Sequence, residues 1–577
     1  MRFASRTHFA RPISLASLAL LASAFSSGCS ADGGGSSVSG GNGGSGNSGG
    51  SGGTSGAGAF GGTGGLLVDA GGSGGGTQQP GVPETCEEAI RQKSYIGCEY
   101  WPTVTSNGKL NAIFEFAVVA ANPTKSTADV IVRRGGNQVA QQSIPPGGIV
   151  TIKLPWVSAL RQDQGRSSVQ VAQGAYHVES SVPITLYQFN PLEFRMGATN
   201  SSSNDASLLL PTTALGTDYY AMTYPTLHLA FRHWSGNPTT WLDDPGFIAI
   251  TATEDGTEVT VTSTAHTRSG SGVGALSPGQ TGTYQLNRGD VLQLVSGLMP
   301  AQETPLPGRP CGTQLVDIDG TTAVMCPSPP EYDLTGSRIQ ANKRISVIAG
   351  HDCTFIPYSR WACDHIEESM FPTETLGQDL IVTAPQSVRH ITTEPGRPDN
   401  MFVRVMSAAD GNTIDFDPPV NPSVTLNAGQ WIEIGPVTQD FRVRSGDRVM
   451  VAQFMVGEDF QGSSAGAGDP ALSVAIPVEQ YRVEYTFLAP ATFTYNYVNV
   501  IAKPGAQITL NGSLIDSSRF SPVGSTGYSV ARLQVPGGAH AMKGDDNFGI
   551  VVYGYAPYTS YMYPGGLNLE KVEIIPR

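Results

Sequence analysis

The stretch FRVRSGDRVMVAQF, residues 441–454, decides the fold of this chain, because copies of it recur along the sequence. The copies are YHVESSVPITLYQF from Tyr176, SRIQANKRISVIAG from Ser337 and, more loosely, DNFGIVVYGYAP from Asp546. Each copy predicts a long strand that closes a unit. The chain is therefore expected to contain four related units.

Two shorter patterns come before the closing strands in a constant order. A segment that opens a unit appears as PTTALGTD at Pro211, as PTETLGQD at Pro372 and, more weakly, at Pro477. Turns between strands appear as IPPGGIVTI, LNRGDVLQL and LNAGQWIEI, which begin at Ile144, Leu286 and Leu426. Because the order is the same each time, the units should share one strand order.

Between these patterns the chain has the signature of half-buried strands. Polar and apolar residues alternate in TEVTVTST, MFVRVMSA and VNVIAKP, and helical periodicity is nearly absent. Each unit has room for about seven strands, whereas a four-stranded propeller blade needs only about 40–50 residues. We therefore predict an all-β fold of tandem, repeated β-sandwich-like units, with a propeller-like ring of large β units as the alternative. The expected units cover 80–205, 206–366, 367–470 and 471–577, and the second carries insertions.

The beginning of the chain predicts export. Three arginines precede the apolar run 13–25, which is too short to span a bilayer, so residues 1–28 are expected to be a signal peptide. The run ends in Ser26-Ser27-Gly28-Cys29, which resembles a bacterial lipobox, so Cys29 is the expected site of lipidation. An ordinary signal peptidase site at Ala22-Ser23-Ala24 is the alternative. Residues 29–79 are mostly Gly and Ser and are expected to form a disordered tether from an outer membrane or cell surface.

Cysteine usage fits an oxidising compartment. Without a lipidated Cys29, six of the seven cysteines remain, and six cysteines predict three disulfides with fifteen possible connectivities. Their grouping into close couples favours the following pairs: Cys86 with Cys98, Cys311 with Cys326, and Cys353 with Cys363.

The stretch GHDCTFIPYSRWACDHIEESMFP, residues 350–372, could instead be a metal or catalytic site. Nine residues separate its two cysteines, unlike the C-x-x-C spacing of zinc sites, so a disulfide that pins the connection between the second and third units is favoured. His351 and His365 are then loop histidines beside the bridge. Its acidic residues Asp364, Glu367 and Glu368 are expected to cap a turn or to face water.

One insertion of the second unit, TLHLAFRHWSGNPTTWLDD, contains the candidate contact residues for a ligand. It gathers His228, His233, Trp234 and Trp241, and aromatic residues on loops often contact partners. The alternative is that this insertion folds back over a sheet face.

Several motifs in order resemble a known family. The segments DLTGSRI, ISVIAGHDC, ACDHIEESMFP and LGQDLIVTAP are similar to the N-terminal domain of the IgG-Fc-binding protein of animal mucus, whose relatives include exported bacterial proteins. The resemblance covers roughly residues 208–577. It implies an extracellular, β-rich binding module, and it does not imply that this chain binds IgG.

The composition narrows the possible functions. The formal net charge of −14, without a basic cluster, argues against nucleic acid as a partner. Gly462 to Gly466 match G-x-S-x-G but lie in a Gly/Ser loop, and there is no HExxH or P-loop motif, so we expect no catalytic centre, metal or cofactor. We predict a non-catalytic surface lipoprotein that binds an extracellular protein or glycan, touching the membrane only through its lipid. A structural spacer or matrix protein and a glycan- or peptide-directed hydrolase are the alternatives.

Overall fold

The computed structural model describes residues 81–575, except 163–165, 234–238, 316–319, 362, 388–395 and 462–466. The predicted signal peptide, Cys29, the tether and Trp234 lie outside the described residues. The described residues form one compact unit. No helix in the described segments is long and apolar enough to cross a membrane.

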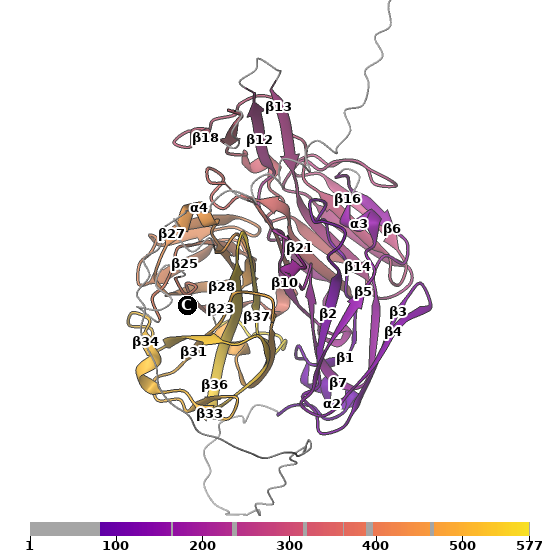
Figure 1. Ribbon diagram of the computed structural model, residues 1–577, viewed down its shortest axis with the longest axis vertical. Helices are drawn as coiled ribbons and strands as arrows, with labels where there is room; N and C mark the ends of the chain where they lie inside the picture. Colours follow the sequence, from indigo (N-terminus) through magenta and orange to yellow (C-terminus); the bar gives the residue numbers. More distant parts are fainter. Residues whose placement is uncertain are drawn as a thin grey trace, which may run out of the picture. The chain divides into compact units, whose positions relative to one another are not determined.

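The described chain is almost entirely β structure (Figure 1). Its short helices are α2 (Cys86–Gln92), α3 (Ser158–Arg161) and α4 (Glu458–Gln461). Single 3-10 turns are η2 (Thr212–Ala214), η3 (Pro330–Tyr332), η4 (Thr373–Thr375), η6 (Val478–Gln480) and η7 (Ser517–Arg519).

The first group of strands ends at residue 209. It comprises β1 (Gly97–Tyr100), β2 (Phe116–Ala121), β3 (Ala128–Arg134), β4 (Asn137–Ile144), β5 (Ile149–Leu154), β6 (Val169–Val171), β7 (His177–Phe189), the small pair β8 (Arg195–Met196) and β9 (Thr199–Asn200), and β10 (Ala206–Leu209). Its central strand is the first predicted closing strand, β7. The order is β4-β3-β7-β2-β5, and β1 and β10 also pair with β7.

The second group contains the following strands: β11 (Asp218–Tyr220), β12 (Leu227–Arg232), β13 (Thr240–Asp244), β14 (Gly246–Ala252), β15 (Thr257–Thr262), β16 (Thr281–Leu286), β17 (Val291–Val295), β18 (Gly312–Leu315), β19 (Thr322–Cys326), β20 (Arg338–Ala341), β21 (Ile345–Thr354) and β22 (Asp364–Ser369). Here the closing strand is divided into β20 and β21. Two sheets result, with the orders β11-β20-β15-β16 and β22-β21-β14-β17-β6. The insertions form a further sheet, β13-β12-β19-β18.

The third and fourth groups repeat the order of the first. The third contains β23 (Gly377–Val382), β24 (Met401–Ser407), β25 (Asn412–Asp417), β26 (Val424–Leu426), β27 (Trp431–Val437), β28 (Phe441–Met455) and β29 (Leu472–Val474). The fourth contains β30 (Arg482–Ala489), β31 (Tyr495–Ala502), β32 (Ile508–Leu510), β33 (Ser513–Leu514), β34 (Phe520–Pro522), β35 (Ser529–Val535), β36 (Gly538–Ala556) and β37 (Thr559–Pro564). Their orders are β26-β25-β28-β24-β27 and β33-β32-β36-β31-β35-β34.

Each long closing strand pairs with different strands along its two halves, which makes the units sandwich-like. The first half of β28 pairs with β23 and β25, and its second half pairs with β24 and β29. The same division occurs in β7 and β36. The predicted all-β fold of repeated sandwich-like units is therefore confirmed.

The recurring Pro and Gly of the opening segments have a packing reason. A Cβ built on Gly97 would lie 2.4 Å from the Cβ of Pro211. The corresponding distances are 2.7 Å for Gly216 against Pro372 and 2.4 Å for Gly377 against Pro477. Only glycine allows these close approaches, so each opening proline packs on the start of the preceding group.

Four short strands, one from each group, come together in the interior. β10 contacts β22 and β37, and β29 contacts the same two strands. Each of the four pairs with its own closing strand and is an edge of its sheet. The N–H groups on the free edges therefore need other acceptors.

The side chain of Asp205 supplies acceptors to all four strands. Its Oδ1 accepts hydrogen bonds from the backbone N–H of Ala206 at 2.9 Å and of Met562 at 3.1 Å. Its Oδ2 accepts from Glu367 and Leu472, both at 3.0 Å. One fully buried carboxylate thus connects β10, β37, β22 and β29.

The first and last described segments also meet. Tyr95 N–H donates to Leu567 O at 3.1 Å, and Leu569 N–H donates to Lys93 O at 2.8 Å. The contacts between successive groups therefore close into a circle.

Strand pairing bears on the expected unit boundaries. The boundary between 366 and 367 falls within β22, which pairs with β21. β10 and β29 likewise pair with the closing strands that precede them. We propose that the units end after these strands, near residues 210, 371 and 476.

Candidate binding surface

The inserted sheet of the second group, which we call the arm, consists of β12, β13, β18 and β19. β12 pairs with β13 on one side and with β19 on the other, and β18 pairs with β19. Figure 1 shows β12, β13 and β18 together at the top of the view. The insertion therefore forms a sheet of its own.

On one face of the arm, His228 holds Trp241 in place. The two rings stack with their centroids 4.7 Å apart and an interplanar angle of 18°. His228 is only 1% exposed, and its ring is fixed by Asp243 Oδ1 at 2.5 Å and Gln302 O at 2.9 Å. Trp241 is partly exposed. Because His228 is buried and both its nitrogens are engaged, its role here is to orient the indole.

The other predicted contact residue that the structure describes lies further along the strand. His233 follows β12, is partly exposed, and its Nδ1 lies 3.3 Å from Thr321 Oγ1. The structure thus brings His228 and Trp241 together and leaves His233 near the end of the arm.

The opposite face of the arm carries aromatic residues that the sequence did not single out. Phe231 and Trp361 are both partly exposed, and their ring centroids are 6.3 Å apart. Trp361 also packs on Phe355 at 5.2 Å. Tyr358, from the same loop, donates to Pro310 O at 2.8 Å. No periodic pattern links β12 to the loop 355–361, so this pairing could not be predicted from the sequence.

Two disulfides brace this region, and all three predicted pairs are present. Cys311–Cys326 joins the residue before β18 to the end of β19, and Cys353–Cys363 joins β21 to the residue before β22. The third, Cys86–Cys98, joins α2 to β1. Cys353–Cys363 closes the β21–β22 pair, so the expectation that it pins a connection between units is wrong.

The acidic residues of the stretch 350–372 are also placed differently from the expectation. Asp364, Glu367 and Glu368 are fully buried, whereas they were expected to cap a turn or face water. They are buried because the backbone N–H groups on the free edges of the inner strands need hydrogen-bond acceptors. Asp364 Oδ2, for example, accepts from Ser560 N–H at 3.1 Å, and Glu368 Oε1 accepts from Leu208 N–H at 3.1 Å.

The pKa values of the neighbouring Glu367 and Glu368 are shifted in opposite directions. Burial raises the pKa of Glu368 well above its usual value. Burial also acts to raise the pKa of Glu367, but hydrogen bonds from His365, Thr105 and Gln188 outweigh it and hold that pKa below its usual value. Such a split could suit an acid/base pair, yet both side chains are enclosed and bonded to structural partners.

Burial keeps His351 neutral. It is fully buried, and burial lowers its pKa to about 3. Its Nδ1 accepts from Cys353 N–H at 3.1 Å, so it donates through Nε2 to Pro225 O at 3.1 Å. Within the described segments, no group of three or more His, Cys, Asp or Glu side chains is arranged to hold a metal ion.

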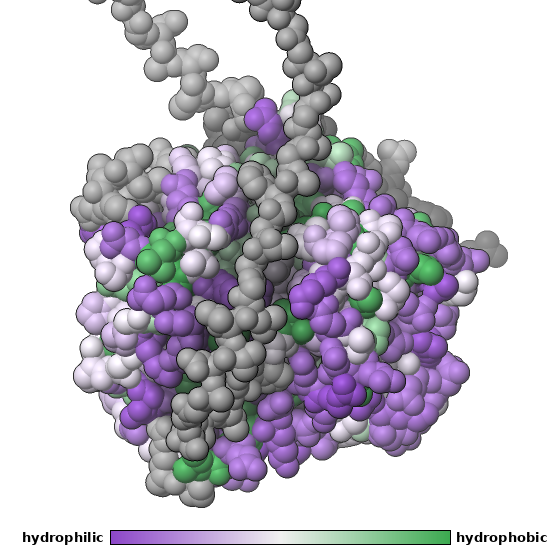
Figure 2. Space-filling model, turned by 90° about the horizontal axis from the view of Figure 1, so that it is seen from below, coloured by the Kyte–Doolittle hydropathy of each residue, from purple (hydrophilic) through white to green (hydrophobic). Residues whose placement is uncertain are grey.

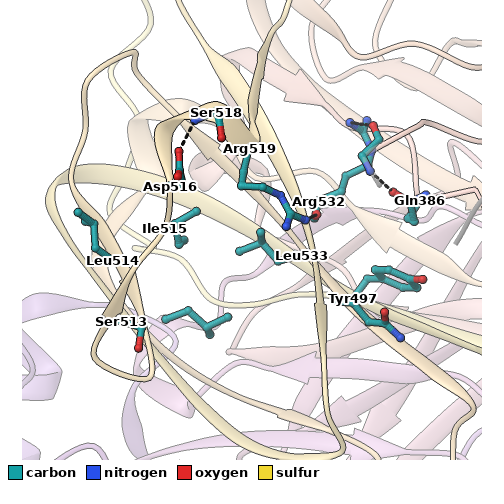
Figure 3. A pocket seen from close by; sticks show the side chains of 13 residues that line it. Gln386, Tyr497, Ser513, Leu514, Ile515, Asp516, Ser518, Arg519, Arg532 and Leu533 are labelled. Atoms are coloured by element: carbon teal, nitrogen blue, oxygen red, sulfur yellow. Dashed lines mark hydrogen bonds between the residues drawn. The ribbon is translucent and has the colours of Figure 1, made fainter. Parts of the chain in front are cut away.

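A separate hollow of about 630 Å³ is lined mainly by the fourth group, together with Gln386 and Gly396 of the third (Figure 3). Its lining includes Leu510, Leu533 and Arg519, and Asp516 accepts from Ser518 N–H at 2.8 Å. Asp516 is the one carboxylate among its described lining residues. A glycosidase mechanism needs two carboxylates flanking the bond, and this hollow offers no such pair in the described chain.

The face seen in Figure 2 contrasts with the arm, because hydrophilic residues predominate on it and the hydrophobic ones shown are scattered. Near the arm, by contrast, Leu298 and Leu315 are 64% and 65% exposed. The arm and its surroundings thus carry two of the exposed large apolar side chains beside the partly exposed Trp241, Phe231 and Trp361, and the other exposed ones lie elsewhere on the protein.

Comparison with known proteins gives one strong match. Residues 205–554 match the family model described as IgGFc binding protein. No curated protein matches the chain. A solved structure, the native alfa-L-rhamnosidase from Aspergillus terreus, aligns with 68% of this chain and 50% of its own length, at 10% identity and a TM-score of 0.10. This chain thus spans about half of that enzyme, and so low a score carries no argument.

Proposed function

Because the chain belongs to the IgGFc binding protein family, we propose that it is a non-catalytic protein of the cell surface that binds an extracellular protein or glycan through its arm. The observation that carries this proposal is the partly exposed indole of Trp241, held flat against the buried ring of His228. A rigid aromatic side chain loses little conformational entropy on binding, so it is an effective anchor for a partner.

The surroundings of Trp241 support this role. Disulfides stiffen both sides of the arm, which reduces the entropy lost when a partner docks. Phe231 and Trp361 add apolar area on the other face. We propose Trp241, His233 and Trp234 as contact residues and His228 as the residue that positions Trp241.

The proposal includes export and anchoring. Three disulfides fit an exported protein. Lipidation at Cys29 and a Gly/Ser tether would hold the arm away from the membrane, where it could reach a soluble or cell-bound partner.

The test is a binding screen of the purified protein against a glycan array and a panel of extracellular proteins. Trp241→Ala should weaken binding to any partner found by tenfold or more, because it removes the anchor. Leu514→Ala is the matched control, since Leu514 is 60% exposed but lies in β33 beside the hollow. If a partner loses affinity for the Leu514→Ala variant and not for the Trp241→Ala variant, the arm is not the binding surface. If neither the glycan array nor the protein panel yields a partner, the structural-spacer alternative is favoured.

A further inference from the structure

Four charged side chains meet where the first two groups of strands join. Lys109 lies between β1 and β2, Arg166 precedes β6, Asp244 ends β13, and Asp352 is in β21. Both aspartate side chains are 0% exposed, and those of Arg166 and Lys109 are 17% and 31% exposed. Two buried carboxylates thus meet the mostly buried guanidinium of Arg166 and the partly exposed ammonium of Lys109.

The contact between Lys109 and Asp244 is not an ordinary hydrogen-bonded ion pair. Lys109 Nζ touches Asp244 Oδ2, yet neither carboxylate oxygen of Asp244 accepts a hydrogen bond from any described residue. The two groups are thus in contact without meeting hydrogen-bond geometry.

The neighbours of this contact have the roles that amide formation needs. Asp352 Oδ2 lies 3.0 Å from Arg166 Nε, and its Oδ1 accepts from Ser106 Oγ and Gly108 N–H, both at 2.8 Å. Arg166 Nη2 also lies 3.7 Å from Asp244 Oδ1, where it can stabilise negative charge that develops on that oxygen.

Asp244 and Asp352 differ in protonation in the way that amide formation requires. Burial raises the pKa of Asp244, which favours the neutral acid. Burial acts the same way on Asp352, but Arg166 and the Gly108 N–H outweigh it and lower its pKa, so it stays ionised. A neutral acid is an electrophile, and an adjacent carboxylate is a base.

We propose that Lys109 and Asp244 become joined by an isopeptide bond that forms within the folded protein. The amine of Lys109, after losing its proton to solvent, attacks Cγ of the protonated Asp244, and the new N–C bond forms. Asp352 takes a proton from Nζ and passes it to the departing hydroxyl. The C–OH bond breaks, water leaves, and an amide replaces the amine and the acid, with no oxidant or cofactor required.

The product is a covalent connection between the first group of strands and the base of the arm. It would hold β13, which carries Trp241, to the loop between β1 and β2 independently of any disulfide. The proposal stands apart from the proposed function, because it concerns only this chain's own residues.

The experiment is a tryptic map of the purified full chain after complete reduction and alkylation. A bond at Lys109 blocks cleavage there, so residues 94–125 should appear joined to residues 233–268, in a species one water molecule lighter than the two peptides together. Fragmentation should place the link at Lys109 and Asp244. A map in which Lys109 is cleaved normally and residues 233–268 appear unmodified would overturn the proposal.

Two variants separate the chemistry from the fold. Lys109→Arg keeps a cation beside Asp244 but offers a far weaker nucleophile, so the joined species should disappear while the protein remains folded. Asp352→Asn should reduce the joined fraction at least tenfold, because the base is lost. A joined species of equal abundance in Lys109→Arg would show that the link does not involve Lys109, and the proposal would fail.

Discussion

At the scale of single residues, the fold depends on a few buried carboxylates that act as acceptors for backbone N–H groups. Asp205 accepts four such bonds, one from each inner strand. Asp364 also accepts four, from Asn204 N–H, His365 N–H, Thr559 Oγ1 and Ser560 N–H. Removing an acceptor leaves a buried donor unsatisfied, which is more costly than the net gain from making the bond.

Asp205→Asn is therefore expected to be strongly destabilising. The amide keeps one acceptor oxygen, so two of the four N–H groups lose their partner and face an NH2 group instead. The free energy of unfolding is expected to fall by roughly 2–6 kcal/mol, or the variant fails to fold. It can be measured as the shift of the urea unfolding midpoint.

Glu368→Gln is the matched control. Glu368 Oε1 accepts from Leu208 and Ser369, while Oε2 accepts no bond within the described residues. An amide can keep both bonds and leaves only its own NH2 group unpaired, so its loss should be smaller than that of Asp205→Asn. If Asp205→Asn and Glu368→Gln lower the free energy of unfolding equally, Asp205 does not have the proposed role as an acceptor.

At the scale of elements, the arm is the part that departs from the repeat. It is a small sheet in which Leu227, Leu229, Met325 and Phe355 form one apolar cluster, and Ala230, Val324 and Cys326 form another. Clusters this small need a covalent brace, which Cys311–Cys326 supplies.

Replacing Cys311 and Cys326 together by Ser should loosen the arm alone. A disulfide that closes a loop of this length contributes about 3 kcal/mol, so hydrogen exchange in β18 and β19 should become faster while β25 and β28 remain protected. Replacing Cys86 and Cys98 in the same way should leave the arm unchanged. Equal exchange in β18 and β19 of the wild type and the first variant would show that the brace is unnecessary.

The elements also show what the sequence could predict. Closing strands such as β28 were recognisable because alternation of side chains is a local property. β22 was mistaken for a loop, since the acceptors on DHIEES serve strands far away in the sequence. The aromatic contact between Phe231 and Trp361 was missed for the same reason, because it depends on tertiary structure.

At the scale of the whole molecule, successive groups of strands are joined through buried arginines. Arg404 of the third group is enclosed by Tyr224 and Trp431, at 4.4 and 4.1 Å from their ring centroids. It donates to Asp333 Oδ2 at 2.8 Å and to Thr223 O at 2.9 Å, both in the second group. Between the fourth and third groups, Arg532 donates to Ala384 O at 2.9 Å and pairs with Asp440.

Arg404→Met should weaken the connection between the second and third groups. It keeps much of the apolar stem but leaves Asp333 buried without its cation, and such losses are about 3–5 kcal/mol. The unfolding midpoint should fall, and adding Asp333→Asn should restore part of it. If the double variant is no more stable than the single one, the charge of Asp333 is not the cause.

The meeting of residues 93–95 with residues 567–569 has a consequence for biosynthesis. A ribosome makes the chain in sequence order, so the beginning of the first strand group waits for a partner that is translated only after all four groups of strands. The earlier groups can form their own sheets meanwhile, but the circle cannot close. A chain that stops before residue 567 would therefore expose the backbone of Lys93 and Tyr95, and the defect would appear at the opposite end of the sequence from the missing residues.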